Sequence, residues 1–250
     1  MNTDKFTGKA FTYEKFRPEY PYRFIEYLFS TIGLSEDSII SDIGSGTGIL
    51  SRQLLEEGRR VFCVEPNEDM RKTAEKNLFS YQNFISVNGS AEQTTLQDKS
   101  IDCITVAQAF HWFNVEKFKQ ECQRILKRSG KVVLVWNSRV ADSPLVVENA
   151  AICKKLCQNF KGFTGGQEKN PVSFNIFFKN GIYEYKAFEN NIFYDKEGFL
   201  GRNLSASYAP KEEDINYEQF TVDINSLFMK YSNNGSLTLP NMTRSYIGEV

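Results

Sequence analysis

Residues 39–48 read Ile-Ile-Ser-Asp-Ile-Gly-Ser-Gly-Thr-Gly, and this stretch decides the fold class of the chain. Its apolar beginning predicts a buried β-strand, and the apolar residues between Ile49 and Leu55 recur at helical spacing. Three glycines lie between the two elements. Glycine adopts positive φ and carries no Cβ, so a ligand can lie against the backbone of such a turn and the first N–H groups of the helix. The stretch therefore predicts a nucleotide-binding turn.

A second apolar strand at 61–64 ends in Glu65, about 20 residues after the first glycine. A carboxylate at this position can accept both hydrogens of a ribose diol, so we expect the ligand to contain an adenosine. The dinucleotide fingerprint G-x-G-x-x-G would need its third glycine where this chain has Ile49. The pattern is instead Asp-x-Gly-x-Gly-x-Gly, from Asp42 to Gly48. A carboxylate here would repel a pyrophosphate but suits a ligand with a cationic group.

In this pattern the sequence resembles the class I methyltransferases that depend on S-adenosyl-L-methionine (SAM). The resemblance implies SAM as the cofactor, with Asp42 organising the glycine loop near the cationic amino end of SAM and Glu65 on its ribose. The cofactor-binding residues that follow from the turn, the second strand and the segments below are Asp42, Gly44, Ser45, Gly46, Gly48, Glu65, Pro66, Met70, Ser90, Ala91, Glu92, Gln108, Ala109, Tyr13, Arg17 and Tyr20.

Two segments that follow predicted strands extend the resemblance. After the strand at 84–87, the family places the adenine edge against residues that correspond to 89–92. Many relatives carry an aspartate where this chain has Ser90, so we assign the exocyclic amine of adenine to Ser90 or Glu92. After the strand at 101–106, the run Gln-Ala-Phe-His-Trp-Phe looks like a segment of the type 11 small-molecule methyltransferases.

In that resemblance Gln108 and Ala109 lie near the methionine part of SAM, while His111 and Trp112 border the methyl acceptor. His111 is the only histidine of the chain and is the candidate catalytic base; the alternative is a structural histidine. The aromatic residues either pack in the core or face the cofactor, where a ring beside the sulfonium would contribute around 1 kcal/mol.

The segment 11–21, Phe-Thr-Tyr-Glu-Lys-Phe-Arg-Pro-Glu-Tyr-Pro, resembles the lid of the same subgroup. Tyr13, Arg17 and Tyr20 are expected to close over SAM and its acceptor. The two prolines stiffen the segment, which suits a lid and equally suits a surface connector.

Strands and helices alternate from about residue 38 to 137, which is typical of a parallel sheet covered on both faces. Asn114 is expected to cap a helix that Gly130 ends. We therefore expect an α/β fold with a doubly wound, mostly parallel, Rossmann-like sheet, which the resemblance completes to seven strands with 183–193 and 237–247. The expected units are an N-terminal lid at 1–30, a SAM-binding Rossmann-like core at 31–137, and a cap insertion plus the last two strands of the same sheet at 138–250.

The bulk composition argues against several function classes. The 250 residues include 30 Lys and Arg against 31 Asp and Glu, so no global basic field would attract nucleic acid or an anionic membrane. No apolar run approaches the roughly 20 residues of a membrane span. The first residues have no signal-peptide core, so we expect a cytoplasmic protein. Cys153 and Cys157 are one helical turn apart, but without a histidine or second thiol pair beside them we expect no metal.

The resemblance implies an in-line displacement that moves the methyl group of SAM to a small-molecule acceptor. A neutral hydroxyl or amine would need a general base, whereas a carboxylate is already a nucleophile and needs an arginine to hold it. Arg139, with Arg17, Arg202 and Arg244, is a candidate for that role, and O-methylation of a small organic acid is our hypothesis. The alternatives are a SAM-binding sensor or partner subunit without methyl transfer, and an RNA methyltransferase. The RNA alternative is disfavoured because residues 108–111 lack an Asn-Pro-Pro-Tyr-like tetrad.

Overall fold

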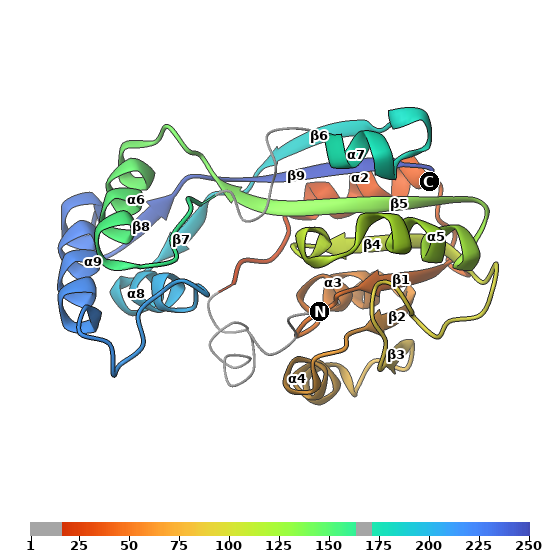
Figure 1. Ribbon diagram of the computed structural model, residues 1–250, viewed down its shortest axis with the longest axis horizontal. Coiled ribbons are helices and arrows are strands. Elements are labelled where there is room, and N and C mark those ends of the chain that lie inside the picture. Colours follow the sequence, from red (N-terminus) through yellow and green to blue (C-terminus); the bar gives the residue numbers. More distant parts are fainter. Residues whose placement is uncertain (1–16, 164–171) are drawn as a thin grey trace.

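The computed structural model describes residues 17–163 and 172–250, and a seven-stranded sheet forms its centre (Figure 1). Its strands are β1 Ile39–Ile43, β2 Arg60–Val64, β3 Phe84–Val87, β4 Ile101–Ala107, β5 Leu126–Arg139, β6 Glu184–Glu189 and β9 Asn241–Gly248. They lie in the order β3-β2-β1-β4-β5-β9-β6. β9 runs opposite to the other six strands of this sheet, so the expected doubly wound, mostly parallel sheet is confirmed.

Helices cover both faces of the sheet, because side chains alternate along the buried strands. Val133 and Val135 of β5 belong to one apolar cluster, while Leu134 and Trp136 belong to the other. The first cluster is covered by α2 Tyr22–Ile32, α3 Ile49–Glu56 and α4 Glu68–Leu78. The second is covered by α5 Val115–Ile125 and α7 Val172–Phe177, and the 3₁₀ turn η2 Phe110–Trp112 packs beside it.

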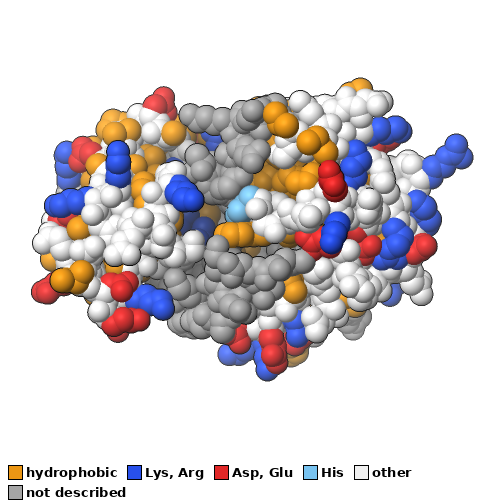
Figure 2. All heavy atoms as spheres, in the orientation of Figure 1, with side chains coloured by type: hydrophobic (Ala, Val, Ile, Leu, Met, Phe, Trp, Pro, Cys, Tyr) orange, Lys and Arg blue, Asp and Glu red, His pale blue; other side chains and the backbone are white. Residues whose placement is uncertain are grey.

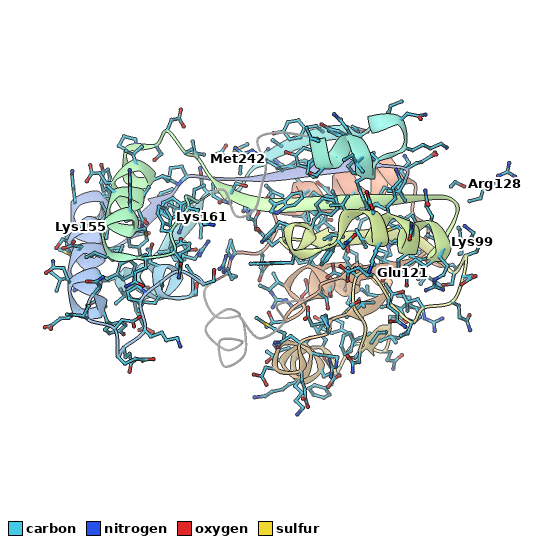
Figure 3. All side chains as sticks on the ribbon, viewed as in Figure 1. Lys99, Glu121, Arg128, Lys155, Lys161 and Met242 are labelled. Atoms are coloured by element: carbon cyan, nitrogen blue, oxygen red, sulfur yellow. The ribbon has the colours of Figure 1, made fainter. Side chains whose placement is uncertain are left out.

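A second lobe with its own apolar core lies beyond one end of the sheet (Figure 1). It contains α6 Pro144–Leu156, β7 Ile192–Tyr194, α8 Lys196–Leu204, α9 Tyr217–Tyr231 and β8 Leu237–Leu239; a 3₁₀ turn, η3 Lys179–Gly181, precedes β6 in the first lobe. β7 pairs antiparallel with β8 in a separate two-stranded sheet. The strand expected at 183–193 is thus divided into β6 and β7, and the strand expected at 237–247 is divided into β8 and β9. Pro240 separates β8 from β9, since proline has no N–H to donate to a ladder. Met242 marks this junction in Figure 3.

Gly130 does not end a helix, contrary to expectation. α5 already ends at Ile125, and Gly130 lies within β5. A Cβ on Gly130 would meet the side chain of Leu126 at 2.7 Å and the carbonyl oxygen of Asp102 at 3.1 Å. The glycine is therefore required by the close approach of neighbouring backbone, which the sequence pattern alone does not distinguish from a helix end.

None of the helices in the described ranges has the length and apolar character needed to cross a membrane. All five cysteines are buried thiols, and the described residues contain no cluster of potential metal ligands.

Amide side chains join the segment before α2 to the sheet at the junction of the lobes. Asn190 Nδ2 lies within hydrogen-bond distance of the carbonyl oxygen of Glu19 (2.9 Å), Asn137 Oδ1 (3.1 Å) and Thr243 Oγ1 (3.2 Å). Asn137 Nδ2 also donates to the carbonyl oxygen of Glu19, at 3.1 Å. These bonds hold residues 17–21 against the ends of β5 and β9.

Replacing Asn190 with alanine should lower the free energy of unfolding by about 1–3 kcal/mol, because the acceptors on three segments lose the two N–H groups that they share. Urea unfolding of the Asn190→Ala variant measures this. Asn159→Ala, at an exposed turn, is the matched control and should change stability by less than about 0.5 kcal/mol. Equal losses in both variants would show that the amide cluster contributes nothing specific.

Candidate active site

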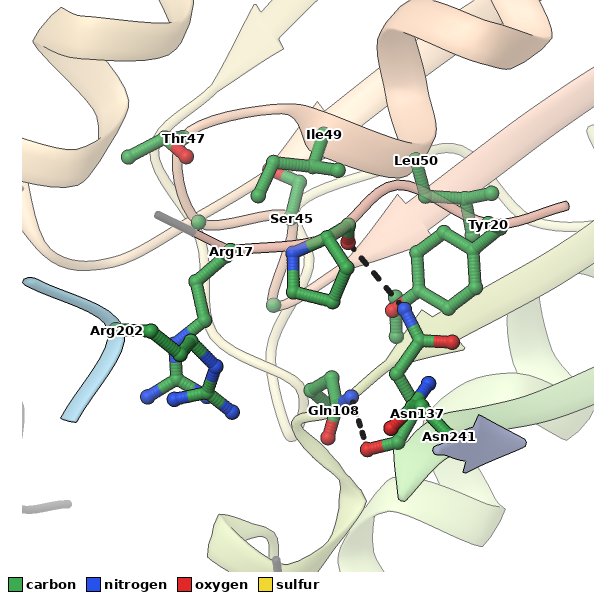
Figure 4. Close-up of a pocket in the computed structure, with 14 residues that line it drawn as sticks. Arg17, Tyr20, Ser45, Thr47, Ile49, Leu50, Gln108, Asn137, Arg202 and Asn241 are labelled. Atoms are coloured by element: carbon green, nitrogen blue, oxygen red, sulfur yellow. Dashed lines mark hydrogen bonds between the residues drawn. The ribbon is translucent and has the colours of Figure 1, made fainter. Parts of the chain in front are cut away.

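A pocket opens at the carboxyl ends of β1 and β4 (Figure 4). The strand order reverses between these two strands, which is where open α/β sheets bind ligands. The pocket has an empty volume of about 540 Å³, part of it open to solvent. It is lined by Arg17, Pro18, Tyr20, Gly44, Ser45, Gly46, Thr47, Ile49, Leu50, Ala107, Gln108, Asn137, Arg202 and Asn241.

The three glycines of the turn have different physical roles. All three adopt positive φ: 68° at Gly44, 58° at Gly46 and 85° at Gly48. A Cβ on Gly44 would lie 2.7 Å from the Cβ of Ala109, and one on Gly48 would lie 2.7 Å from the side chain of Leu78. A Cβ on Gly46 would meet nothing within 4 Å. Gly44 and Gly48 are thus required for packing, and Gly46 leaves the pocket side of the turn open.

Glu65 fixes the glycine turn through its carboxylate. Oε2 accepts a hydrogen bond from the backbone N–H of Gly46 at 2.9 Å, and Oε1 accepts one from Asn67 at 2.8 Å. Glu65 is buried, and burial raises the pKa of its carboxyl, opposed by these backbone hydrogen bonds and by Arg71. Each oxygen keeps acceptor capacity beyond its backbone bond. The carboxylate can therefore organise the turn and still accept from a ligand.

Asp42 lies beneath the turn instead of on the pocket wall. Its carboxylate is fully buried and accepts hydrogen bonds from Ser51 Oγ at 2.6 Å and Thr105 Oγ1 at 2.9 Å. Burial raises the pKa of this carboxyl from 3.8 to about 6. The structure thus gives Asp42 the expected organising role, joining β1 to α3 and β4, but does not bring it to where a cationic ligand end would lie.

Gln108 holds a strained position at the end of β4. Its φ is 60°, which is uncommon for a residue other than glycine. Its backbone N–H donates to the carbonyl oxygen of Val135 at 2.9 Å, and its side-chain Nε2 donates to that of Asn137 at 3.0 Å. Because the side-chain nitrogen is used in this way, the orientation of the amide is fixed at the pocket wall.

The aromatic segment after Gln108 divides between core and surface. Phe110 is buried, and its ring centroid lies 4.9 Å from that of Phe177. His111 and Trp112 are exposed, with ring centroids 4.6 Å apart, and neither lines the pocket. Figure 2 shows the one histidine of the chain at the surface near the middle of the molecule. Of the expected acceptor-side residues, the structure therefore brings neither His111 nor Trp112 to the pocket wall.

The segment expected to contact adenine forms a tight turn. The backbones of Ser90 and Gln93 bond to each other, and Ala91 is buried. Glu92 Oε1 accepts a hydrogen bond from the backbone N–H of Asn114 at 2.8 Å. Glu92 Oε2 is buried and has no hydrogen-bond partner among the described residues. Met70 is also buried, on the α4 turn that follows Pro66.

The structure separates the four candidate arginines. Arg17 and Arg202 line the pocket, and Arg139 is buried at the end of β5 with its guanidinium carbon 3.8 Å from the ring centroid of Phe163. Arg244, in the middle of β9, does not line it. Of the expected lid residues, Arg17 and Tyr20 lie on the pocket wall, whereas Tyr13 is outside the described residues.

The sequence assigned no role in the site to several lining residues: Pro18, Thr47, Ile49, Leu50, Ala107, Asn137 and Asn241. Asn137 carries a usable signal, because it is the first polar residue after the apolar run of β5 and lies at the carboxyl end of a strand. Asn241 carries none, since it reaches the pocket only through the antiparallel pairing of β9 with β5.

Known proteins resemble this chain in sequence over part of its length. Residues 41–134 match a family model described as a methyltransferase domain. An uncharacterized methyltransferase of Schizosaccharomyces pombe is 31% identical over 151 residues, which cover 60% of this chain and 57% of that protein. The chain thus spans little more than half the length of this relative.

Solved structures share the fold over most of the chain. A type II methyltransferase from Anaeromyxobacter dehalogenans superimposes with a TM-score of 0.63 at 20% identity, covering 94% of this chain and 98% of that one. Phosphoethanolamine N-methyltransferase 2 of Haemonchus contortus superimposes with a TM-score of 0.56 at 16% identity, covering 96% of this chain and 56% of that one. The latter structure holds S-adenosylhomocysteine and phosphomonomethylethanolamine.

The Asp42 carboxyl should make stability depend on pH. Between pH 4 and 6 the folded state binds its proton more tightly than the unfolded chain, so the free energy of unfolding should fall as pH rises through this window. The isosteric Asp42→Asn variant lacks this contribution, and the wild type should lose on the order of 1–3 kcal/mol relative to it. Urea unfolding of both proteins at pH 4.5 and 7 measures the difference. Identical pH dependences would contradict the burial of a titrating Asp42.

The glycine roles predict an asymmetry between two alanine variants. Gly46→Ala adds a side chain in open space and should cost only the strain of positive φ, about 1 kcal/mol. Gly44→Ala adds the same strain and an overlap with Ala109, so it should cost a further 1–3 kcal/mol or so. Chemical unfolding of the pair tests this. Gly46→Ala being as destabilising as Gly44→Ala would mean that the turn is packed differently.

Proposed function

We propose that the chain is a class I SAM-dependent methyltransferase of the type 11 family, whose methyltransferase-domain model matches residues 41–134, and that it transfers the methyl group of SAM to a small-molecule acceptor. The observation that carries the proposal is the turn between β1 and α3. Its three glycines adopt positive φ, and a buried carboxylate from the end of β2 bonds to its middle. This arrangement suits a ligand that lies on backbone and presents a ribose diol to Glu65.

The ribose hydroxyls and the exocyclic amine of adenine each have a complementary partner in the proposed site. The ribose hydroxyls donate to the acceptor capacity that Glu65 retains. The exocyclic amine of adenine is a donor, and the buried Oε2 of Glu92 is an acceptor that lacks one. Because a buried unsatisfied oxygen costs free energy, Glu92 is favoured over Ser90 for this contact.

The methionine half extends toward Gln108 and the segment before α2. Gln108 Nε2 is bonded to the carbonyl oxygen of Asn137, so the remaining side-chain oxygen can accept from the ammonium group of SAM. Arg17 and Tyr20 cover the pocket and would exclude water from the reacting groups. Asp42 supports the turn from below and does not itself contact SAM in the proposal.

The reaction is an in-line displacement in which an acceptor atom attacks the methyl carbon and S-adenosylhomocysteine leaves. Little covalent chemistry falls to the protein, because the positive sulfur already activates the methyl group. Alignment of the reactants and exclusion of water can supply up to about 7–11 kcal/mol. His111 would act as a base only for a neutral acceptor and would have to move to the pocket to do so.

We further propose that the acceptor is a small organic acid methylated on oxygen. Two arginines line the pocket, and no aspartate or glutamate is among the lining residues that the structure describes. The balanced net charge of −1 favours a small molecule over RNA or a membrane surface as the partner, and a cytoplasmic location is part of the proposal. A SAM-binding protein without methyl transfer would use the same cofactor residues and is the alternative.

Incubation of the protein with methyl-labelled SAM and a small-molecule extract of its own cells should move label to an acceptor, and mild base should release that label as methanol. Glu65→Ala should weaken SAM binding at least tenfold, because bonds to a charged group are worth about 1.5–3 kcal/mol. Equilibrium dialysis measures that affinity, with Asn159→Ala as the unaffected control.

The result of the labelling experiment distinguishes between the proposed acceptor and its alternatives. Label that is stable to base would mean an ether, amine or thioether and would overturn the organic-acid acceptor. SAM binding without any transfer would favour the binding-only alternative. Unchanged SAM affinity in Glu65→Ala would remove the basis of the whole proposal.

A further inference from the structure

Two arginines from different lobes meet beside the pocket. Arg139 is the last residue of β5, and Arg202 lies in the last turn of α8. Arg202 lines the pocket together with Arg17, and Figure 4 shows these two side chains on the same side of it. Arg139 pairs in register with Asn241, which lines the pocket together with Arg202. Burial and then the charge of Arg202 lower the pKa of Arg139, in agreement with this placement.

Local sequence explains why α8 presents Arg202 at this place. Asp195 caps the helix, accepting a hydrogen bond from the backbone N–H of Gly198 at 2.7 Å. Phe199 is fully buried in the apolar core of the second lobe and fixes the rotation of the helix. Arg202 follows one turn later, at the end of the helix where the backbone dipole favours a positive charge.

Arg139 has no carboxylate partner among the described residues, and the Tyr208 side chain beside it acts to raise the pKa that burial lowers. Arg139 is only 9% exposed and stacks on the ring of Phe163. Its Nε and Nη2 are buried and have no hydrogen-bond partner among the described residues. Nε of Arg202 is likewise buried without a hydrogen-bond partner among them. Burial lowers the pKa of Arg139, because a desolvated cation is costly. Within the described ranges neither arginine forms an ion pair with a carboxylate.

A neutral donor lies on the same pocket wall. Asn241 is 3% exposed, and its Nδ2 is buried without a partner in the part of the chain that the structure describes. Its backbone N–H donates a hydrogen bond to Asn191 Oδ1 at 3.3 Å, and this bond fixes the position of the residue. Arg202 and Asn241 thus line the cavity with buried, unpartnered donors, and Arg139 lies directly beside Asn241 in the β5–β9 register.

We infer that Arg139 and Arg202, with Asn241, form an anion subsite that binds a carboxylate group of the methyl acceptor. The planar guanidinium fork matches the two oxygens of a carboxylate, and an anion would remove both the repulsion between the arginines and the unsatisfied donors. That the bound carboxylate belongs to a methyl acceptor rests on the proposed function. The anion subsite itself does not depend on methyl transfer.

Because the subsite joins the two lobes, its occupation should change the thermal stability of the protein, which can be measured without any activity. A bound carboxylate stabilises the folded state by mass action. Succinate should therefore raise the Tm of the wild type in a saturable way, by about 5–10 °C at 100 times the half-saturating concentration, without SAM present. Sodium chloride at matched ionic strength should not reproduce this rise.

Arg139→Gln and Arg202→Gln should each abolish the succinate-dependent rise in Tm, and each should lower label transfer to the cell extract at least tenfold. Both should bind SAM within twofold of the wild type, because neither is among the residues proposed to contact SAM. Arg202→Lys keeps the charge but not the fork and should give a smaller rise than the wild type. Arg128→Gln is the matched control, since Arg128 is exposed at the far end of the first lobe (Figure 3).

A succinate response that survives in both glutamine variants would overturn the inference, as would a response to inorganic phosphate that equals or exceeds the response to succinate. Arg202→Lys covers the case in which a glutamine variant fails to fold. A wild-type protein that does not bind SAM would refute the proposed function. The succinate response is measured without SAM and would still test the subsite, so the two failures are distinguishable.

Discussion

The pocket depends on one buried carboxylate that ties two strands together. Glu65, at the end of β2, bonds to the backbone of Gly46 in the turn after β1 and to Asn67 at the start of α4. The contact is made by the backbone N–H of Gly46, and a Cβ on this residue would meet nothing within 4 Å, so the pocket side of the turn is open. From this constraint follow the open cradle, the exposed backbone on which a cofactor can lie, and the placement of a ribose acceptor beside it.

The second lobe makes a cofactor cradle into a site for two ligands. β5 and β9 extend past the end of β4, so Asn241 lines the pocket and Arg139 lies beside it in the β5–β9 register. α8 adds Arg202 from the other lobe, and the amide cluster around Asn190 holds the segment that carries Arg17. In the proposed site, backbone and one carboxylate would bind the cofactor, whereas cationic side chains of distant segments would bind the acceptor.

The sequence predicts the cradle well because its determinants are local. The strand, the glycine turn and Glu65 lie within about 25 residues, and each has a distinctive residue type. The same reasoning misplaced Asp42, since burial beneath the turn depends on Ser51 and Thr105 from other elements. The acceptor side was predicted only as a set of candidate arginines, because their convergence depends on the packing of the second lobe, where no periodic motif marks a residue.

The most direct test of this account is a crystal structure of the protein with S-adenosylhomocysteine. The account predicts the ribose hydroxyls within about 3 Å of the Glu65 carboxylate, adenine beside Glu92, and the homocysteine part next to Gln108. A ligand bound elsewhere, or one whose ribose lies away from Glu65, would contradict the central claim that this carboxylate organises the cofactor site.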